Sequence, residues 1–210
     1  TCALPISLDR NDIPKMIVNP VTGGDYMKTL MSARNRKIDK IIYDSARGAI
    51  TSKDGLTSYT LPAGQQIAHG GTGLTKAKII QAKKIFRANE ADMHTGEELF
   101  FVYNSAALED ILADTTLTSA DFLAVKMLQD GDVNSKWMGF NWIPYEGITL
   151  SGSTYFTVAW AKSGLHFGRG FEEGNVARRP DKKDLWQVSM SASYGSGRQD
   201  DVKVVEIAFQ

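Results

Sequence analysis

The clearest pattern along the chain is a run of apolar residues at helical spacing that begins near Asp25. The apolar positions are Tyr26, Met27, Leu30, Ile38, Ile41 and Ile42. Arg34, Arg36 and Lys37 lie between them and fall on the opposite face. Asp25 can cap the start of the helix, and Gly48 stands where a left-handed C-cap belongs. The pattern therefore predicts one helix of roughly 20 residues, about 30 Å long, with a single buried stripe.

Between this helix and Gly147, shorter helical and strand patterns alternate. Ala49–Ser52 and Leu56–Thr60 flank Gly55 and predict a hairpin, and a polar, glycine-rich loop is expected over Gly64–Gly73. Helices are predicted at Lys76–Ala88, Ala106–Ala113 and Ser119–Gln129, and strands at Glu98–Tyr103 and Lys136–Ile143.

Beyond Gly147 the chain becomes rich in strand patterns, at Thr154–Lys162, Leu185–Ser193 and Val202–Phe209. Turns rich in glycine and serine, and a charged loop over Glu172–Asp184, are expected to separate them. This order of elements predicts an α+β fold. The middle of the chain reads as an insertion between the first helix and the closing strands, so we expect two lobes built from a split chain.

Charge and composition narrow the classes of function. Lys plus Arg and Asp plus Glu number 24 each, so no net field attracts nucleic acid or an anionic membrane. The 42% of hydrophobic residues and 23% of charged residues predict a soluble protein with a packed core. A single cysteine, Cys2, excludes an internal disulfide framework and a cysteine-rich zinc site. No apolar run approaches the roughly 20 residues that a membrane-spanning helix needs.

The stretch Gly70–Lys76 is the strongest candidate for a ligand site, because glycine-rich loops that lead into helix N-termini bind phosphates. It departs from both phosphate-binding templates. Lys76 follows Thr75 where the P-loop has the opposite order, and it stands where the dinucleotide fingerprint has its third glycine. A nucleotide-binding enzyme is therefore the alternative hypothesis, and a loop that leads into a helix capped by Thr75 is the favoured one.

Other polar groups do not predict catalysis or metal binding. His69, His94 and His166 are far apart, and none has a partner at metal-ligand spacing. Gly195-Ser196-Gly197 lacks the spacing of a nucleophile elbow and predicts a turn. The adjacent acidic pairs, which predict solvated faces, are Glu97-Glu98, Glu109-Asp110, Glu172-Glu173 and Asp200-Asp201. We therefore expect no catalytic residues, no cofactor and no metal.

Two further features are compatible with an interaction protein. The basic run Arg178–Lys183 is bordered by acidic residues, which favours a subunit contact or a solvated loop over a phosphate site. The four tryptophans, which all lie on or beside predicted strands, are Trp137, Trp142, Trp160 and Trp186. Such aromatic residues serve either in a core or at an interface, and the sequence leaves both readings open.

An ordered series of motifs gives the chain a family resemblance. The motifs are Gly73-Leu74-Thr75 before a helix, Phe101-Val102-Tyr103-Asn104-Ser105 before Leu108-Glu109-Asp110-Ile111-Leu112, Ser119-Ala120-Asp121-Phe122, Gln129-Asp130-Gly131-Asp132-Val133, and Met138-Gly139-Phe140-Asn141-Trp142-Ile143-Pro144. In this order they resemble the major capsid proteins of tailed bacteriophages, which have the Hong Kong 97-type capsid fold. The segment Met31–Arg47 looks like the long spine helix of that family.

The resemblance implies a division of the chain. Residues 1–21 would be the end of an N-terminal extended arm or loop, 22–50 the spine helix of a peripheral domain, 51–147 an axial domain, and 148–210 the closing strands of the peripheral domain. The chain does not begin with Met, and a family member would carry a longer arm and loop before the spine helix, so we expect that most of that part is missing upstream.

The resemblance also implies the function and partners. The protein would be a structural subunit that assembles with itself, as hexamers and pentamers, into an icosahedral shell around double-stranded DNA. Scaffolding, portal and decoration proteins are further expected partners, and the DNA would be contacted non-specifically. The expected location is the virion, with the host cytoplasm during assembly. A cellular nanocompartment shell of the same fold is a second alternative beside the nucleotide-binding enzyme.

Overall fold

The computed structural model describes residues 2–8, 25–52, 54–91, 95–113 and 136–210, and it divides into two compact units. Unit 1 comprises Thr1–Ile41 and Phe167–Ser196, and unit 2 comprises Ile42–His166 and Gly197–Gln210. Helices and strands both contribute to the described part, so the predicted α+β class is confirmed. Among the described residues, no helix is long and apolar enough to cross a membrane.

The predicted first helix is present as α1 (Asp25–Arg47). Leu30 is buried in unit 1, and Tyr43 and Ala46, which the predicted stripe did not include, are buried in unit 2. The expected left-handed cap at Gly48 is wrong, because the φ of Gly48 is not positive. Its N–H continues the helical pattern by donating to the carbonyl oxygen of Asp44 at 2.7 Å, and a Cβ at this position would lie 2.7 Å from the same oxygen. Close approach of the backbone, not φ, therefore requires glycine here.

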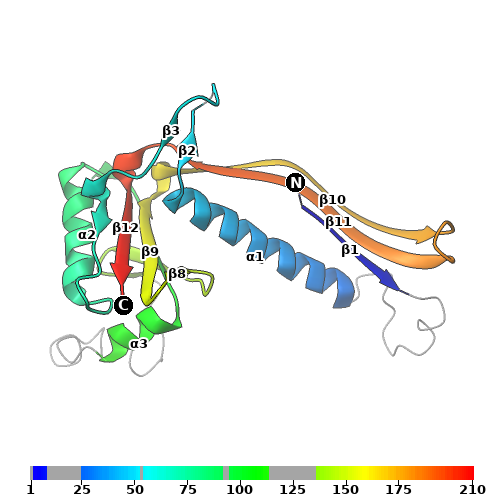
Figure 1. Cartoon of the computed structure of the whole chain (residues 1–210), viewed down its shortest axis with the longest axis horizontal. Helices are drawn as coiled ribbons and strands as arrows, with labels where there is room; N and C mark the ends of the chain where they lie inside the picture. Colours follow the sequence, from blue (N-terminus) through cyan, green and yellow to red (C-terminus); the bar gives the residue numbers. More distant parts are fainter. Residues whose placement is uncertain (1, 9–24, 53, 92–94, 114–135) are drawn as a thin grey trace. The chain divides into compact units, whose positions relative to one another are not determined.

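Unit 1 contains a three-stranded sheet in the order β1-β11-β10. Its strands are β1 (Cys2–Leu8), β10 (Leu165–Arg179) and β11 (Leu185–Arg198), of which the last two begin or end in unit 2. β1 runs antiparallel to β11, from the pair Cys2↔Ala192 to the pair Leu8↔Trp186, and Figure 1 shows the two side by side. The buried residues of this unit include Leu8, Leu30, Val188 and Met190.

Strands β10 and β11 each correct one prediction. The charged loop expected over Glu172–Asp184 is a strand as far as Arg179, and Gly195-Ser196-Gly197 lies inside β11 and not in a turn. Most side chains of β10 are exposed, so its sequence lacks the alternation of polar and apolar residues that identifies a half-buried strand. An edge strand of this kind has no hydrophobic signal to recognise.

Unit 2 is built on a mixed seven-stranded sheet in the order β4-β12-β9-β5-β7-β6, with β8 paired to β9. The strands are β4 (Gln66–Ile67), β5 (Leu99–Tyr103), β6 (Lys136–Trp137), β7 (Phe140–Pro144), β8 (Thr149–Ser151), β9 (Thr154–Ala161) and β12 (Val204–Phe209). β5 and β7 are parallel, as are β12 and β4, and the remaining pairs are antiparallel. The predicted hairpin after α1 is present as β2 (Ile50–Thr51) and β3 (Ser58–Tyr59), and Gly55 in its turn has a φ of 73°.

Both faces of the unit 2 sheet are covered, which gives three layers. On one face, helices α2 (Lys76–Ala88) and α3 (Ser105–Ala113) pack on a core that contains Phe101, Phe140 and Ile207. On the other face, Tyr43 and Ala46 from the end of α1 pack on Val102, Val158 and Val204. Figure 1 shows α2 running beside β12. Because apolar residues point to both faces, nearly every residue of β12 is buried and the strand shows no clean alternation.

Two other predictions differ in detail from the structure of unit 2. The single strand expected at Lys136–Ile143 is the hairpin β6–β7, turned by Met138 (φ 50°) and Gly139 (φ 79°). Two consecutive positive φ values are typical of a type I′ turn, and the Met-Gly pair is not among its usual sequence signals. The glycine-rich loop contains β4 and is therefore not wholly irregular. The helix expected at Ser119–Gln129 lies outside the described residues.

The compact units do not follow the predicted domain limits of 1–21, 22–50, 51–147 and 148–210. Strands β9 and β12, from the last of these segments, pair within the same sheet as β5 and β7, from the third. Contacts between strands far apart in the sequence thus define unit 2, and no composition change marks its limits. The assignment of axial and peripheral domains stays a prediction.

Candidate functional site

The glycine-rich loop, the candidate for a nucleotide site, is closed by a lysine of its own helix. Lys78 Nζ donates to the carbonyl oxygens of His69, Thr72 and Gly73 at 2.8, 2.7 and 2.8 Å. Burial lowers the pKa of Lys78, and the negative charge of Asp110 opposes this shift. The lysine side chain therefore occupies the inside of the loop, where a phosphate-binding loop would hold its ligand.

Backbone donors of the loop before α2 are also taken, whereas the side chain of Thr75, the expected cap, makes no capping hydrogen bond. Asp110 Oδ2 of α3 accepts from the N–H of Leu74 at 2.7 Å, and His69 Nδ1 accepts from the N–H of Gly71 at 3.0 Å. The N–H of Thr75 donates to the carbonyl oxygen of Gly73 at 3.0 Å. A carboxylate of the chain thus stands where an anion would bind to the helix N-terminus. Lys76 is exposed outside the loop, so the geometry does not favour the nucleotide-binding reading.

Histidines and acidic residues do not form a metal site in the described part of the chain. There, no three side chains of the ligand-forming types His, Cys, Asp and Glu lie close enough to hold an ion. His69 and His166 are exposed, and His94 lies outside the described residues. Ser196 lies inside β11, where the chain does not make the sharp strand-to-helix turn that a nucleophile elbow requires.

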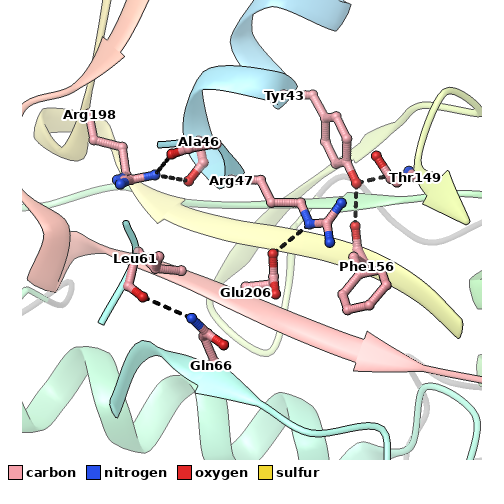
Figure 2. A network of polar contacts seen from close by, with 10 residues as sticks. Tyr43, Ala46, Arg47, Leu61, Gln66, Thr149, Phe156, Arg198 and Glu206 are labelled. Atoms are coloured by element: carbon pink, nitrogen blue, oxygen red, sulfur yellow. Dashed lines mark hydrogen bonds and ion pairs between the residues drawn. The ribbon is translucent and has the colours of Figure 1, made fainter. Parts of the chain in front are cut away.

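A buried arginine organises unit 2 at the end of α1 (Figure 2). The side chain of Arg198 is fully buried, and its Nε donates to Asp201 Oδ1 at 2.7 Å. Its two terminal nitrogens donate to the carbonyl oxygens of Ala46 at 3.2 Å, of Gly48, and of Tyr59 at 3.1 Å. One guanidinium thus satisfies the free carbonyl groups at the end of α1 and joins them to β3.

A second pair of contacts fixes the last turns of α1 on the sheet (Figure 2). The Tyr43 hydroxyl donates to the carbonyl oxygen of Phe156 and accepts from the N–H of Thr149 at 2.9 Å. Arg47 Nε donates to Glu206 Oε2 at 2.6 Å, and its guanidinium lies 4.0 Å from the ring centre of Phe156. These polar groups connect α1 to β8, β9 and β12.

Glu97 departs from the solvated role predicted for the acidic pairs. Its carboxylate accepts from the N–H and hydroxyl of Ser163 and from Lys203 Nζ, which also contacts the Ser163 oxygen at 2.7 Å. The hydrogen bond from Ser163 is the main cause that lowers the pKa of Glu97. The cluster joins the start of β5 to the turns η4 (Lys162–Gly164) and η5 (Asp201–Lys203). The Ser163 hydroxyl donates its proton to Glu97 and not to Lys203, so the two residues do not form the nucleophile and base pair of a catalytic site.

Unit 1 has a groove beside α1 with methionine walls and a charged end. A cleft of about 460 Å³ is lined in part by Met27, Met31 and Met190, and by two glycines of β10. Arg34 of α1 pairs with Glu172 of β10, which also pairs with Arg169 at 3.5 Å. The basic run Arg178–Lys183 is exposed at the end of β10 and in the following turn, and its ion pairs with Asp184 and Asp181 are local.

Three residues of the predicted motifs, Gly73, Leu74 and Asp110, lie together in the structure. The Asp110 carboxylate binds the N–H of Leu74 beside Gly73, so these residues form a closed loop and not a ligand site. The four tryptophans all lie on strands, as predicted, and Trp137 and Trp142 are buried in the core. Arg198, Tyr43 and Glu97 were missed as organising residues, because their partners lie up to about 150 positions away and are mostly backbone atoms.

Comparison with known proteins agrees with the fold. A chain from Mycobacterium phage Che8 is 16% identical, with a TM-score of 0.74 over 98% of this chain and 69% of that one. The acid-stable capsid of Helicobacter pylori bacteriophage KHP30 is 11% identical, with a TM-score of 0.67 over 100% and 75% of the two chains. An encapsulin from Synechococcus elongatus is 12% identical, with a TM-score of 0.59 over 98% and 72%. At these identities the likeness shows the fold alone. No curated protein matches the sequence.

The fold is therefore that of viral capsid and encapsulin shells. The match of the sequence to a protein family shows which of these two classes the chain belongs to. The model of the phage capsid protein family matches residues 3–210, and the chain belongs to this family. It is a major capsid protein, a structural component of the phage virion.

Proposed function

We propose that many copies of this chain assemble as hexamers and pentamers into an icosahedral shell around double-stranded DNA. The observation that carries the proposal is the match to the phage capsid family over residues 3–210. Its physical support is that the well-formed polar clusters of the described residues, around Lys78, Arg198 and Tyr43, end on the chain's own backbone. Groups already satisfied in this way stabilise a rigid tile and leave no reactive atom for a substrate.

Unit 2 is the proposed axial domain, which gathers around the symmetry axes, and unit 1 is the proposed peripheral domain. Unit 2 has three layers and a large aromatic core, as expected of a body that keeps its shape in several slightly different positions. Unit 1 offers a long, exposed edge strand, β10, which is suited to contacts between copies. Scaffolding, portal and decoration proteins are proposed as further partners.

Contact with DNA is proposed to be non-specific. The chain has equal numbers of basic and acidic residues, so attraction to phosphates depends on local surfaces and not on its net charge. No enzymatic step is part of the proposed function. A structural protein of a shell acts by mutual burial of apolar surface, with charged groups setting the register.

Electron microscopy of the complete expressed gene product tests the proposal. Closed shells, or rings and sheets of capsomers, are expected. A protein that stays strictly monomeric under all assembly conditions, with or without co-expressed phage proteins, contradicts it.

A nucleotide titration of the same protein tests the enzyme alternative. We expect no binding of ATP or GTP by calorimetry, with Lys76→Ala indistinguishable from the unmodified chain. Saturable binding that Lys76→Ala abolishes would revive the nucleotide-binding hypothesis.

A further inference from the structure

Helix α2 has a strongly uneven charge. Its 13 residues include five cations and no acidic residue, although the whole chain has equal numbers of the two. The cations are Lys76, Lys78, Lys83, Lys84 and Arg87. Because no carboxylate of the same helix offsets them, the helix produces a positive potential at its surface.

Three of these lysines give one side of the helix its charge. Lys76 and Lys84 are exposed and eight positions apart, which places them about 12 Å from one another along the helix axis. Among the described residues, neither takes part in an ion pair. Lys83 is half-buried, and its Nζ donates to the carbonyl oxygen of Met138 at 2.8 Å, an uncharged partner that leaves the charge of the lysine in place. Lys78 differs from them, because its ammonium group points into the glycine-rich loop.

A shallow hollow of about 510 Å³ lies along this side of α2. Its lining includes Ile80, Lys83, Lys84 and Met138, and it contains no acidic residue. Ile80 is 50% exposed and is the only large apolar side chain of α2 that is exposed. A protein partner would need more apolar surface than this at the centre of its contact. The surface is therefore suited to a ligand that is bound through its charge.

Other basic stretches of the described chain contain their own counter-charges. In the run Arg178–Lys183, Arg178 pairs with Asp184, and Arg179 pairs with Asp181 at 3.0 Å. Helix α1 has three acidic residues among its six basic ones. These carboxylates weaken the attraction of both stretches for an anion, whereas α2 has no such group.

We propose that the exposed side of α2, with Lys76, Lys83 and Lys84, binds the phosphate backbone of double-stranded DNA. The inference rests on the proposed function, in which the shell encloses DNA, and names a surface through which this chain would contact it. One DNA strand carries a phosphate about every 3.4 Å along the helix axis, so the distance between Lys76 and Lys84 spans about three to four phosphates. Contacts of lysine with phosphates carry no sequence information, which agrees with non-specific binding.

The salt dependence of DNA binding tests this surface. The affinity of the complete, unassembled gene product for a duplex of about 30 base pairs is measured by fluorescence anisotropy at a series of salt concentrations. The logarithm of the binding constant is expected to fall linearly with the logarithm of the salt concentration. Lys76→Gln/Lys84→Gln removes two charges, so the slope is expected to become shallower by about 1.8, or about 0.9 for each lost phosphate contact. Lys76→Arg/Lys84→Arg keeps both charges and is expected to preserve the slope.

A matched control separates this surface from basic charge in general. Lys182→Gln/Lys183→Gln makes the same charge change at exposed positions in the turn after β10, and is expected to leave the slope unchanged. Circular dichroism melts identify any variant that has lost its fold. An unchanged slope in folded Lys76→Gln/Lys84→Gln, or an equal change in the control, overturns the inference.

Electron microscopy of the same variants keeps the inference apart from the proposed function. Lys76→Gln/Lys84→Gln is expected to form normal shells that hold less DNA. Failure of this variant and of Ile80→Ser to assemble, with unchanged affinity for DNA, overturns the inference in favour of a protein partner and leaves the proposed function in place. If the unmodified chain forms no shells, the proposed function fails, whereas the DNA titration still decides the inference.

Discussion

Arg198 Nη1 donates to the carbonyl oxygen of Ala46 at 3.2 Å, although 152 positions separate the two residues in the sequence. The same guanidinium also reaches Gly48, Tyr59 and Asp201. The free carbonyl groups at the end of a helix are usually satisfied by a glycine-based cap or by water. Here a side chain from β11 replaces that cap, which explains why Gly48 does not adopt the left-handed conformation.

Replacement of Arg198 by methionine should destabilise the chain strongly. The substitution keeps much of the side-chain volume but leaves buried carbonyl groups and Asp201 without their donor. The expected loss in the free energy of unfolding is about 3–5 kcal/mol, the usual effect of removing one partner from a buried charged group. Urea unfolding of the unassembled chain measures it. Lys182→Met, at an exposed position, is the control, and a loss below about 0.5 kcal/mol for Arg198→Met would contradict the role assigned to this residue.

Tyr43→Phe should remove two hydrogen bonds and leave the packing of the ring intact. The hydroxyl joins Phe156 to Thr149, and the ring lies 5.5 Å from that of Tyr145. We expect a loss of about 1–3 kcal/mol, because the N–H of Thr149 is left without its acceptor. Tyr59→Phe provides the matched comparison, since Tyr59 is exposed and meets Arg198 through its backbone oxygen. Equal melting temperatures of the two variants would show that the hydrogen bonds of the Tyr43 hydroxyl do not stabilise the fold.

Acid should weaken unit 2 through Glu97. The pKa of Glu97 is lowered below its ordinary value of 4.5, mainly by the hydrogen bond from Ser163. A carboxyl group with a lowered pKa in the folded state stabilises the fold above the unfolded value, and this contribution is lost as the pH falls through the folded value. Glu97→Gln should therefore reduce stability at pH 7 and flatten the dependence of stability on pH below about 4.5. Glu98→Gln changes an exposed neighbour and should preserve the slope, as measured by urea unfolding at pH 3 to 7. An unchanged slope in Glu97→Gln would count against the cluster.

Much of the fold could be predicted because local patterns carry it. α1 and α2 have single apolar stripes with clear limits, and β5 and β9 are dense in apolar and aromatic residues, so periodicity and composition identify them. β10 could not be recognised, because an exposed edge strand with interspersed charges has the composition of a loop. The β6–β7 hairpin was not predicted for another reason. Its turn places Met138, which is not a usual turn residue, in a left-handed conformation.

The candidate site, like the fold, could be predicted from the sequence only in part. The glycine-rich loop could be recognised in the sequence. Whether it can bind a ligand depends on Lys78 and Asp110, whose side chains fill the places that a ligand would take. That Lys78 turns back into the loop and that α3 brings Asp110 to the N–H of Leu74 are results of tertiary packing. Sequence spacing shows neither. The contacts of Arg198 and Tyr43 are with backbone atoms, which leave no mark on the identity of the partner residue.

Gly73 and Asp110 should be coupled energetically, and this is the sharpest test of the filled loop. A Cβ at position 73 would lie 2.5 Å from the carboxylate of Asp110, while that carboxylate accepts from the neighbouring N–H of Leu74. Gly73→Ala should therefore destabilise the chain by about 1–3 kcal/mol, because the carboxylate must move and the N–H loses its acceptor. Asp110→Ala should itself be destabilising, and adding Gly73→Ala to it should have little further effect. Urea unfolding of both single variants and the double variant gives the coupling energy, for which we expect about 1–3 kcal/mol. Strictly additive effects would show that the carboxylate does not occupy the loop as described.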